Sequence, residues 1–373
     1  MVRGIYVHIP FCSYKCPYCD FLSVTDLPVE PEDYVDLVVE EAKMYSHLKC
    51  KLETLYIGGG TPTILEPALI VKLIENISEV FGVLGWKEIT VECNPETYNY
   101  YDFIRLREGG VNRLSVGVQT FSKHGLRALG RKHSVADSIA TLENAMSAGF
   151  SNINVDLIYG YPDHKAAHME LDLRCVEELK PQHVSAYMLT VYENTKFSVY
   201  HRNGLVSLPC EDEIREIYEV LCNGLSSAGY RRYEISNWAL NGHECVHNLM
   251  YWNMEEFVGL GVSSWGFVNR IRYANTKNVR EYALKISNGR KPVRSVYHVD
   301  EEEWLKEFVM LRLRLVEGVP PWLRLNIPDR LVPFLDVEKD HVRIKEEYMI
   351  LANEITSELL VYNSCMASNF PEV

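Results

Sequence analysis

Residues 6–21 read YVHIPFCSYKCPYCDF, with thiols at Cys12, Cys16 and Cys19. A tight loop can bring three thiols so spaced to one side, where soft sulfur ligands bind a metal centre. A lone iron or zinc ion takes four ligands, whereas three thiolates match a cubane four-iron four-sulfur cluster with one open iron. The spacing alone also allows a zinc site that borrows a histidine, or thiols with only a structural role.

Composition narrows the class of protein. The 373 residues carry a formal net charge of −13, with 47% hydrophobic and 24% charged residues, as in a globular protein with one large and one smaller domain. An acidic surface argues against nucleic acid as a partner. No apolar run of about eighteen residues and no signal peptide is found, and ten cysteines suit a reducing compartment, so we expect a cytoplasmic protein.

Strand-like and helix-like segments alternate from the N-terminus, which indicates βαβ units and a parallel sheet. Six such strands, several followed by amphipathic helices such as 32–47 and 135–148, predict an α/β fold: an open, three-quarter (β/α)6 barrel resembling part of a TIM barrel. The predicted strands are Gly4–Ile9, Leu52–Ile57, Lys87–Val91, Asn112–Val118, Asn152–Ile158 and His183–Met188.

Polar residues stand where these apolar runs stop, at the end of the strands where such barrels place their chemistry. Glu92 and Gln119 follow the third and fourth strands, and Asp156 lies within the fifth. The glycines at 58–60 let the backbone approach a ligand, although such a run is more often a plain tight turn. A carboxylate at a strand end is equally a helix cap or an ion-pair partner.

The pattern changes after residue 205. An amphipathic helix is predicted at 211–228, followed by an aromatic stretch from 233 to 266 that contains His247. A histidine beside Trp, Tyr and Met can bind a porphyrin iron, but is more often hydrogen-bonded in a core. From 299 onward we expect a helix through Leu315, a short hairpin at 334–344 and a final helix. The predicted division is therefore a partial barrel with the cysteine loop at 1–205, a barrel-extending α/β segment at 206–298 and a C-terminal helical module at 299–373.

The CxxxCxxC spacing resembles the radical S-adenosylmethionine (SAM) superfamily. That resemblance implies a four-iron four-sulfur cluster on Cys12, Cys16 and Cys19, whose open iron chelates SAM. The wider run YVHIPFC resembles the branch that holds the oxygen-independent coproporphyrinogen III oxidases and the HemW-type haem chaperones. By this resemblance the SAM pocket consists of Tyr6, Gly59, Gly60, Thr61, Glu92, Gln119, Arg131, Asp156, Thr190 and Trp265.

Residues 247–252, HNLMYW, resemble the HNxxYW motif of the haem-binding relatives, which makes His247 the candidate haem ligand. The C-terminal part resembles a small winged-helix-like helical module. Two departures from the oxidases favour the chaperone: Phe21 replaces their fourth cysteine, and only eleven residues precede Cys12.

We therefore expect a protein that binds haem and passes it to a haem-accepting apoprotein, with an electron donor for the cluster and SAM cleavage as a secondary activity. The alternatives are an oxidative decarboxylase of coproporphyrinogen III, which is an enzyme and not a carrier, and a radical enzyme acting on another substrate.

Overall fold

The computed structural model describes residues 1–338 and 341–364. Its centre is six parallel strands that are neighbours in chain order, as the sequence predicts. The alternation of strands and helices is therefore confirmed, and the strand limits differ from the predicted ones by at most two residues. The strands are β1 (Val2–Ile9), β2 (Cys50–Gly59), β3 (Glu88–Cys93), β4 (Arg113–Gln119), β5 (Ile153–Tyr159) and β6 (His183–Met188).

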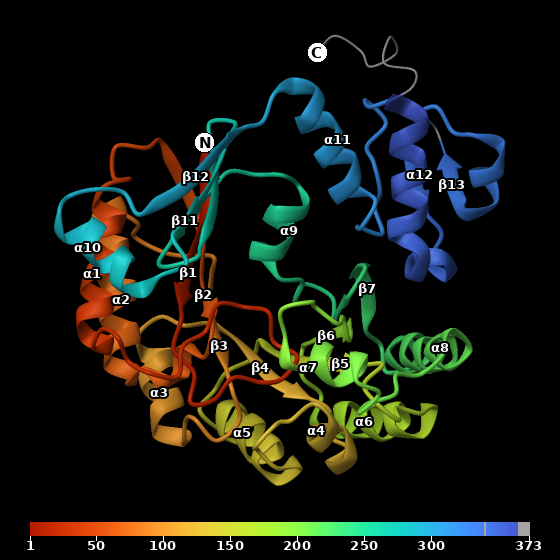
Figure 1. Ribbon diagram of the computed structural model, residues 1–373, viewed down its shortest axis with the longest axis horizontal. Coiled ribbons are helices and arrows are strands. Elements are labelled where there is room, and N and C mark those ends of the chain that lie inside the picture. Colours follow the sequence, from red (N-terminus) through yellow and green to blue (C-terminus); the bar gives the residue numbers. More distant parts are fainter. Residues whose placement is uncertain (339–340, 365–373) are drawn as a thin grey trace.

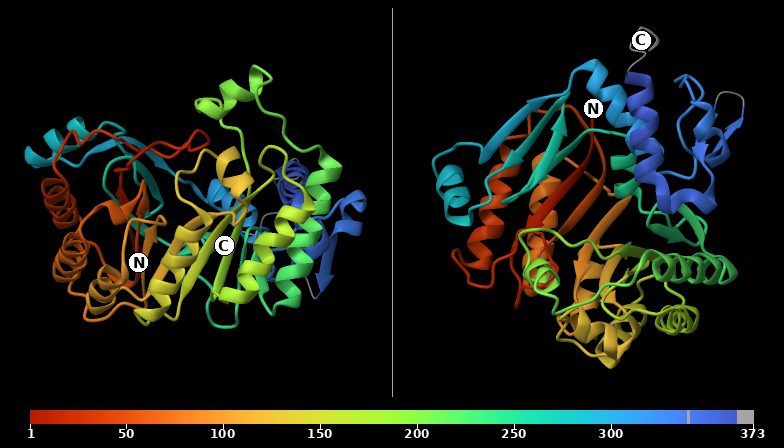
Figure 2. Two further views of the ribbon diagram at one scale, coloured as in Figure 1. Left: turned by 90° about the horizontal axis from the view of Figure 1, so that it is seen from below. Right: turned by 45° about the vertical axis from the view of Figure 1, so that its right-hand side comes forward.

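The helices that connect these strands cover the outer face of the curved sheet (Figures 1 and 2). Local signals fix where several of them begin: proline occupies the first turn of two, and Asn99 and Ser134 form capping boxes with the aspartates three residues on. The helices are α1 (Pro31–Lys43), α2 (Pro67–Phe81), α3 (Tyr100–Glu108), α4 (Lys123–Ala128), α5 (Val135–Ser147) and α6 (Ala166–Leu179), with a 3₁₀ turn, η1 (Pro62–Ile64), after β2.

Successive side chains of the six strands alternate between the two faces of the sheet. One set is apolar, packs under the helices and forms the main core, as Ile5, Leu55 and Val91 do. The other set is polar and faces the interior of the barrel: β1 contributes Tyr6 and His8, and the remaining strands contribute Thr54, Tyr56, Glu88, Glu92, Arg113, Ser115, Asn154, Asp156, His183 and Ser185. The interior is thus built for polar contacts.

The segment after β6 lengthens the sheet at both edges. Next to β6 lies β8 (Asn237–Ala239), antiparallel to it, and β7 (Arg231–Glu234) pairs antiparallel with β8 at the edge of the sheet. At the opposite edge β9 (Phe257–Leu260) runs parallel to β1 and continues into an antiparallel meander. The other elements of this segment are α7 (Lys196–Arg202), α8 (Glu211–Ser227), α9 (Val246–Trp252), β10 (Trp265–Val268), β11 (Ile271–Asn275), α10 (Val279–Ser287) and β12 (Val293–His298).

The C-terminal elements lie beside the open side of the barrel (Figure 1). They share a second apolar core that includes Leu305, Val309 and Leu359, and to which Met254 and Phe267 also belong. The predicted hairpin and final helix are present, apart from 339–340 and 365–373, which lie outside the described residues. The elements are α11 (Glu301–Arg312), η2 (Asp329–Phe334), β13 (Leu335–Glu338), β14 (His341–Ile344), η3 (Glu346–Leu351) and α12 (Ala352–Ser364). The three-part domain division stays a prediction.

Two predicted helix ends are wrong. The helix expected through His47 ends at Lys43. Beyond it the backbone amides donate to carbonyls three residues back, which makes turns and not a further α-helical turn, as seen at Tyr45, Ser46 and Leu48. The helix expected through Leu315 ends at Arg312. Apolar periodicity continues past both ends because the following turns also bury their apolar side chains. No helix among the described residues combines the length and apolar character needed to cross a membrane.

Asp172 of α6 fixes the chain just past the C-terminal end of β4. Its carboxylate accepts hydrogen bonds from the Thr120 hydroxyl (2.9 Å) and the Phe121 amide (2.6 Å). Asp172 is fully buried, and burial raises the pKa of its carboxyl from 3.8 to about 7. At pH 5 the Asp172 carboxyl is therefore protonated in the folded protein and ionised in the unfolded chain.

This raised pKa predicts a pH-dependent stability. The contribution of Asp172 is complete below its unfolded pKa and is lost as the pH rises through about 7. Asp172→Asn keeps an acceptor oxygen for both donors but cannot titrate, so we expect it to lose about 2 kcal/mol less stability than the wild type between about pH 5 and about pH 8. Urea unfolding across this range measures the difference. Glu170→Gln, on the exposed side of the same helix, is the control; equal pH slopes for wild type and Asp172→Asn would contradict the assignment.

Candidate functional site

The cysteine loop leaves the C-terminal end of β1 and is closed at its base. Phe11 pairs with Val24 in an isolated bridge, and the Cys12 amide donates to the Val24 carbonyl at 2.9 Å. The Phe197 amide of α7 donates to the Pro17 carbonyl at 2.9 Å and holds the middle of the loop. The three cysteines therefore lie on one short, anchored loop at the strand end where the sequence predicts them.

The three thiols are half-buried and each has polar neighbours. Cys12 Sγ lies 3.5 Å from Thr61 Oγ1, and Arg131 Nη1 donates to Cys16 Sγ at 3.3 Å. Burial raises the pKa of the Cys12 and Cys19 thiols, and the neighbouring cysteines raise it further. Metal binding at this loop must therefore displace protons.

Arg131 connects the loop to the barrel. Besides Cys16, its guanidinium donates to Asn94 Oδ1 at 2.8 Å and to the Gly117 carbonyl at 3.0 Å, while its buried Nε has no described partner. Asn94 in turn donates to Thr61 Oγ1 at 2.8 Å, next to Cys12. Sequence reasoning placed Arg131 and Thr61 in the site but missed Asn94, the residue that joins them.

The glycine run after β2 lies too close to other groups to carry side chains. A Cβ on Gly60 would lie 2.6 Å from the Phe11 carbonyl oxygen, and one on Gly59, whose φ is +116°, would lie 2.6 Å from the His8 ring. The Gly60 amide donates to the Ile9 carbonyl at 2.7 Å and the Thr61 amide to that of Phe11 at 2.8 Å. This segment thus packs directly against the start of the cysteine loop.

Glu92 accepts hydrogen bonds from the Gly59 amide and the Tyr56 hydroxyl, both at 2.9 Å. Burial raises the pKa of its carboxyl to about 7, and the negative charge of nearby Asp156 raises it too. Asp156 accepts from Ser115 Oγ (3.0 Å) and Asn154 Nδ2 (2.8 Å). Both carboxylates are therefore held inside the barrel by hydrogen bonds, as the cost of burying them demands.

The remaining predicted pocket residues are less concentrated. Gln119 ends β4 in a left-handed conformation with φ of 69°, and its amide group lies beside Gly117. Trp265 is 49% exposed at the start of β10. Thr190 is exposed, and its described hydrogen bond goes to the Met188 carbonyl. The structure thus brings Gly59, Gly60, Thr61, Glu92 and Arg131 together, whereas the described hydrogen bond of Thr190 stays within its own segment.

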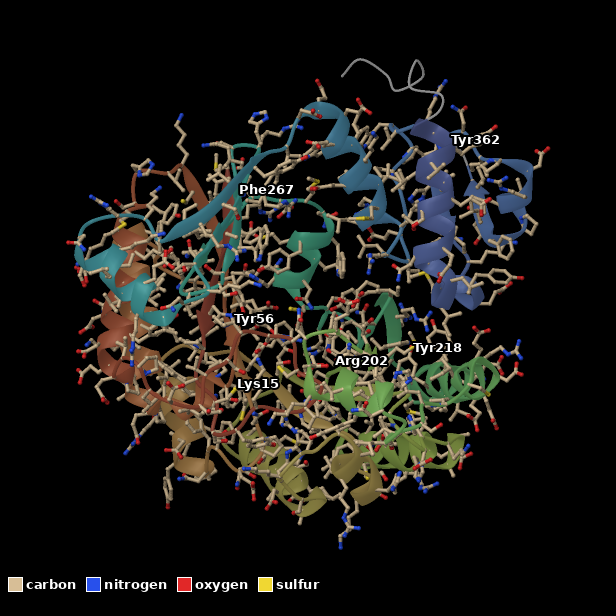
Figure 3. The ribbon with its side chains drawn as sticks, in the orientation of Figure 1. Lys15, Tyr56, Arg202, Tyr218, Phe267 and Tyr362 are labelled. Carbon is tan, nitrogen blue, oxygen red and sulfur yellow. The ribbon has the colours of Figure 1, made fainter. Side chains whose placement is uncertain are left out.

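A cavity of about 790 Å³ opens between the cysteine loop, the barrel interior and α9, a volume in the range of small-molecule sites. Figure 3 labels three of its residues, Lys15, Tyr56 and Phe267, which come from segments far apart in the sequence. Five predicted site residues line it: Tyr6, Cys19, Glu92, His247 and Trp265. Other lining residues are His8, Lys15, Asp20, Phe21, Leu22, Tyr56, Asn194, Asn248, Tyr251, Met254, Glu255, Phe257, Ser263, Ser264, Phe267, Arg272, Lys277 and Leu311.

His247 lies on α9 in the wall of this cavity and is 1% exposed. Its Nδ1 is 2.8 Å from Thr54 Oγ1 and its Nε2 is 2.7 Å from the Tyr251 hydroxyl. Burial, and then the charge of Arg113, lower the pKa of the imidazole to about 3, so the ring is neutral near pH 7. His247 is therefore hydrogen-bonded in a core and also borders a cavity, and its role as a haem ligand stays a prediction.

The thiol set suits a cluster better than a single ion. Among residues 1–338 and 341–364, no three His, Cys, Asp or Glu side chains are gathered as a single metal ion requires. A cubane cluster distributes its thiolates over separate irons, so its ligands need not meet at one point.

The family model of the radical SAM superfamily matches residues 6–176. The solved structure of coproporphyrinogen III oxidase (HemN) from Escherichia coli has the same fold, with a TM-score of 0.82 over 97% of this chain and 90% of that chain, at 22% identity. The fold and the cysteine loop are therefore those of a radical SAM protein, a class that implies a four-iron four-sulfur cluster and SAM.

Among curated relatives, proteins named heme chaperone HemW are similar along most of their length. The identity is 37% in Lactococcus lactis (85% of this chain and 83% of that protein) and 34% in Bacillus subtilis (85% of each). In Mycobacterium tuberculosis it is 32%, over 96% of this chain and 94% of that protein. The chain belongs to the HemW family.

The cysteine loop gives a direct test of the cluster. Because Cys16 is one of the three predicted thiolate ligands and contacts Arg131, Cys16→Ser should abolish the iron and sulfide content of anaerobically reconstituted protein, together with its visible absorption. Cys175→Ser, on α6 and away from the loop, is the matched control. Iron and sulfide at the wild-type level in Cys16→Ser would contradict the assignment.

Proposed function

We propose that this protein is a HemW-like haem chaperone, which binds haem in the cavity beside α9 and delivers it to haem-accepting apoproteins. One observation carries the proposal: in a chain of the HemW family, the cavity that begins at the cysteine loop has a neutral histidine, His247, in its wall. A neutral imidazole nitrogen is a common axial ligand of haem iron. Phe267, Leu311 and Trp265 line the same cavity and offer apolar surface to a flat macrocycle.

In this proposal Cys12, Cys16 and Cys19 hold the cluster, and Arg131 supplies positive charge beside Cys16. The cluster, when bound, supplies an open iron that can chelate SAM and an electron that can cleave it. The SAM pocket is assigned to Tyr6, Gly59, Gly60, Thr61, Glu92, Gln119, Arg131, Asp156, Thr190 and Trp265. Thr190 is the weakest member of that set, because its described contact is to its own segment.

The alternative function is the decarboxylation of coproporphyrinogen III. The position of the oxidases' fourth cysteine is held here by Phe21, whose side chain is 68% exposed and lines the cavity. A phenyl ring there offers apolar contact and no metal ligand. The haem acceptor and the electron donor are to be identified by experiment, and turnover decides whether the protein is an enzyme.

Haem titration of the cluster-loaded protein tests the proposal. We expect about one haem per chain in the wild type. In His247→Ala, whose ring no longer supplies an axial nitrogen, we expect a shifted absorption spectrum and affinity weakened about tenfold or more. Optical titration under anaerobic conditions measures both quantities.

The control is His243→Ala, a half-buried histidine near α9 that does not line the cavity, and its spectrum should match the wild type. A coproporphyrinogen turnover assay on the same wild-type sample separates the two functions. Absence of haem binding overturns the proposal, and formation of protoporphyrinogen establishes the alternative.

A further inference from the structure

The two ring nitrogens of His247 have different surroundings. Nδ1 faces Thr54 of β2, which is 1% exposed and does not line the cavity. Nε2 faces the hydroxyl of Tyr251, which does line the cavity. A ligand that enters the cavity therefore reaches His247 from the side that Tyr251 occupies.

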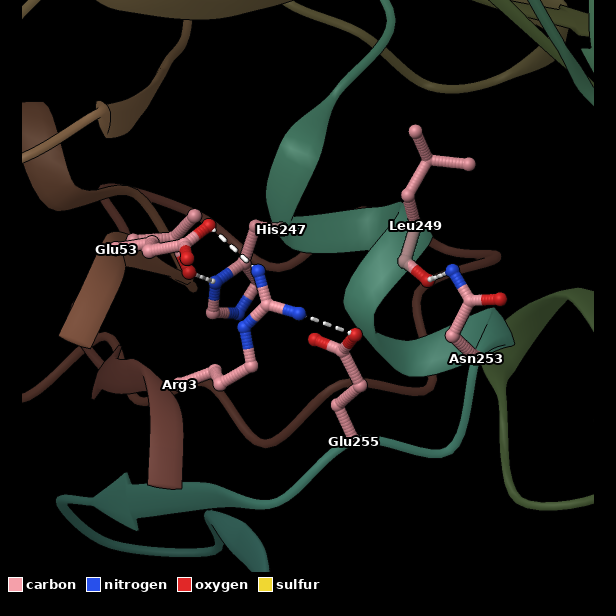
Figure 4. A network of polar contacts seen from close by, with 7 residues as sticks. Arg3, Glu53, His247, Leu249, Asn253 and Glu255 are labelled. Atoms are coloured by element: carbon pink, nitrogen blue, oxygen red, sulfur yellow. Dashed lines mark hydrogen bonds and ion pairs between the residues drawn. The ribbon is translucent and has the colours of Figure 1, made fainter. Parts of the chain in front are cut away.

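Helix α9 is held at both ends and in its middle. At its start, Glu88 accepts the amides of Val246 (2.9 Å) and His247 (3.1 Å). Just past its end, Glu255 pairs with Arg3 at 2.6 Å, and Arg3 also pairs with Glu53 of β2 (Figure 4).

In the middle of α9, Met250 packs so closely on β1 that a Cβ on Gly4 would lie 2.5 Å from its Sδ. The helix backbone is thus held against the first three strands. Access to Nε2 of His247 must therefore change through movement of side chains and not through movement of α9.

We propose that the Tyr251 hydroxyl blocks access to Nε2 of His247 in the haem-free protein and must move away before haem iron can bind there. In the same proposal the Thr54 hydroxyl orients the ring by accepting a hydrogen bond from Nδ1–H. This inference rests on the proposed function. In the haem-free protein Tyr251 occupies Nε2, whichever ring nitrogen carries the proton.

In the bound state the bond from iron to Nε2 replaces the contact with Tyr251. The imidazole stays neutral with its proton on Nδ1, and Thr54 Oγ1 accepts a hydrogen bond from Nδ1–H at the 2.8 Å distance already present. A second partner of this kind, which fixes the ring and its tautomer, is typical of metal-bound histidines. Thr54 is therefore a positioning residue, and Tyr251 competes with the ligand.

The two residues should change haem affinity in opposite directions. Tyr251→Phe keeps the ring but removes the competing hydroxyl, so ferric haem should bind about three- to tenfold more tightly, the equivalent of one ordinary hydrogen bond. Thr54→Val leaves the Nδ1 proton without an acceptor and should weaken binding by a similar factor. Thr54→Ser restores the hydroxyl and should bind as the wild type does.

The experiment is an optical titration of cluster-loaded full-length protein with ferric haem and, in parallel, with metal-free protoporphyrin IX. The metal-free ligand cannot take Nε2, so all four proteins should bind it equally. Thermal unfolding of each variant without ligand confirms that it is folded.

Weaker or unchanged haem binding by Tyr251→Phe overturns the inference, and so does an equal effect on both ligands. If the wild type binds no haem, the proposed function fails instead. If the wild type binds haem and His247→Ala binds it equally well, haem carriage stands and the role of Tyr251 and Thr54 is refuted.

Discussion

Inside the barrel, buried polar side chains must be hydrogen-bonded to one another, because an unpaired buried group costs free energy. Alternate residues of all six parallel strands turn polar groups inward, so the strands are linked by side-chain contacts as well as by the sheet. Ser115, Asn154 and His183, on three successive strands, form one connected set around Asp156. The position of each carboxylate is therefore set by residues on neighbouring strands.

The same need for hydrogen-bonded partners also determines the position of α9. Arg113 is 1% exposed at the start of β4 and brings a positive charge close to Glu88. Glu88 then binds the amides at the start of α9. A short helix of seven residues gains little stability from its own backbone bonds, so these contacts from the strands determine where it lies. The family motif sits on that helix and is oriented by residues at the beginning of the strands.

Much of this could be predicted from the sequence, and the exceptions have a common cause. Strand positions were predicted because apolar runs and glycine turns are local signals. Glu92 and Gln119 were found from their place at strand ends, Asp156 as a carboxylate within an apolar strand, and the cysteine loop from its spacing. Residues 206–298 were predicted to extend the barrel, but their pairing with both edges of the sheet was not, because strand pairing is not a local property. Asn94 and Thr54 were missed for the same reason, since their partners lie 33 to 193 residues away.

Tyr56 shows how closely the two halves of the cavity are joined. Its hydroxyl donates to Glu92, on the side of the cysteine loop, and its ring lies 5.1 Å from the ring of His247, on the side of α9. The side chain of Tyr56 thus lies between Glu92 and His247. It cannot move away from one of them without changing its contact with the other. A ligand bound at Glu92 and a ligand bound at His247 would share Tyr56 as part of their binding sites. If one ligand changes the affinity for the other, the second must change the affinity for the first by the same factor. The polar interior that positions the cluster side of the site therefore also positions the histidine.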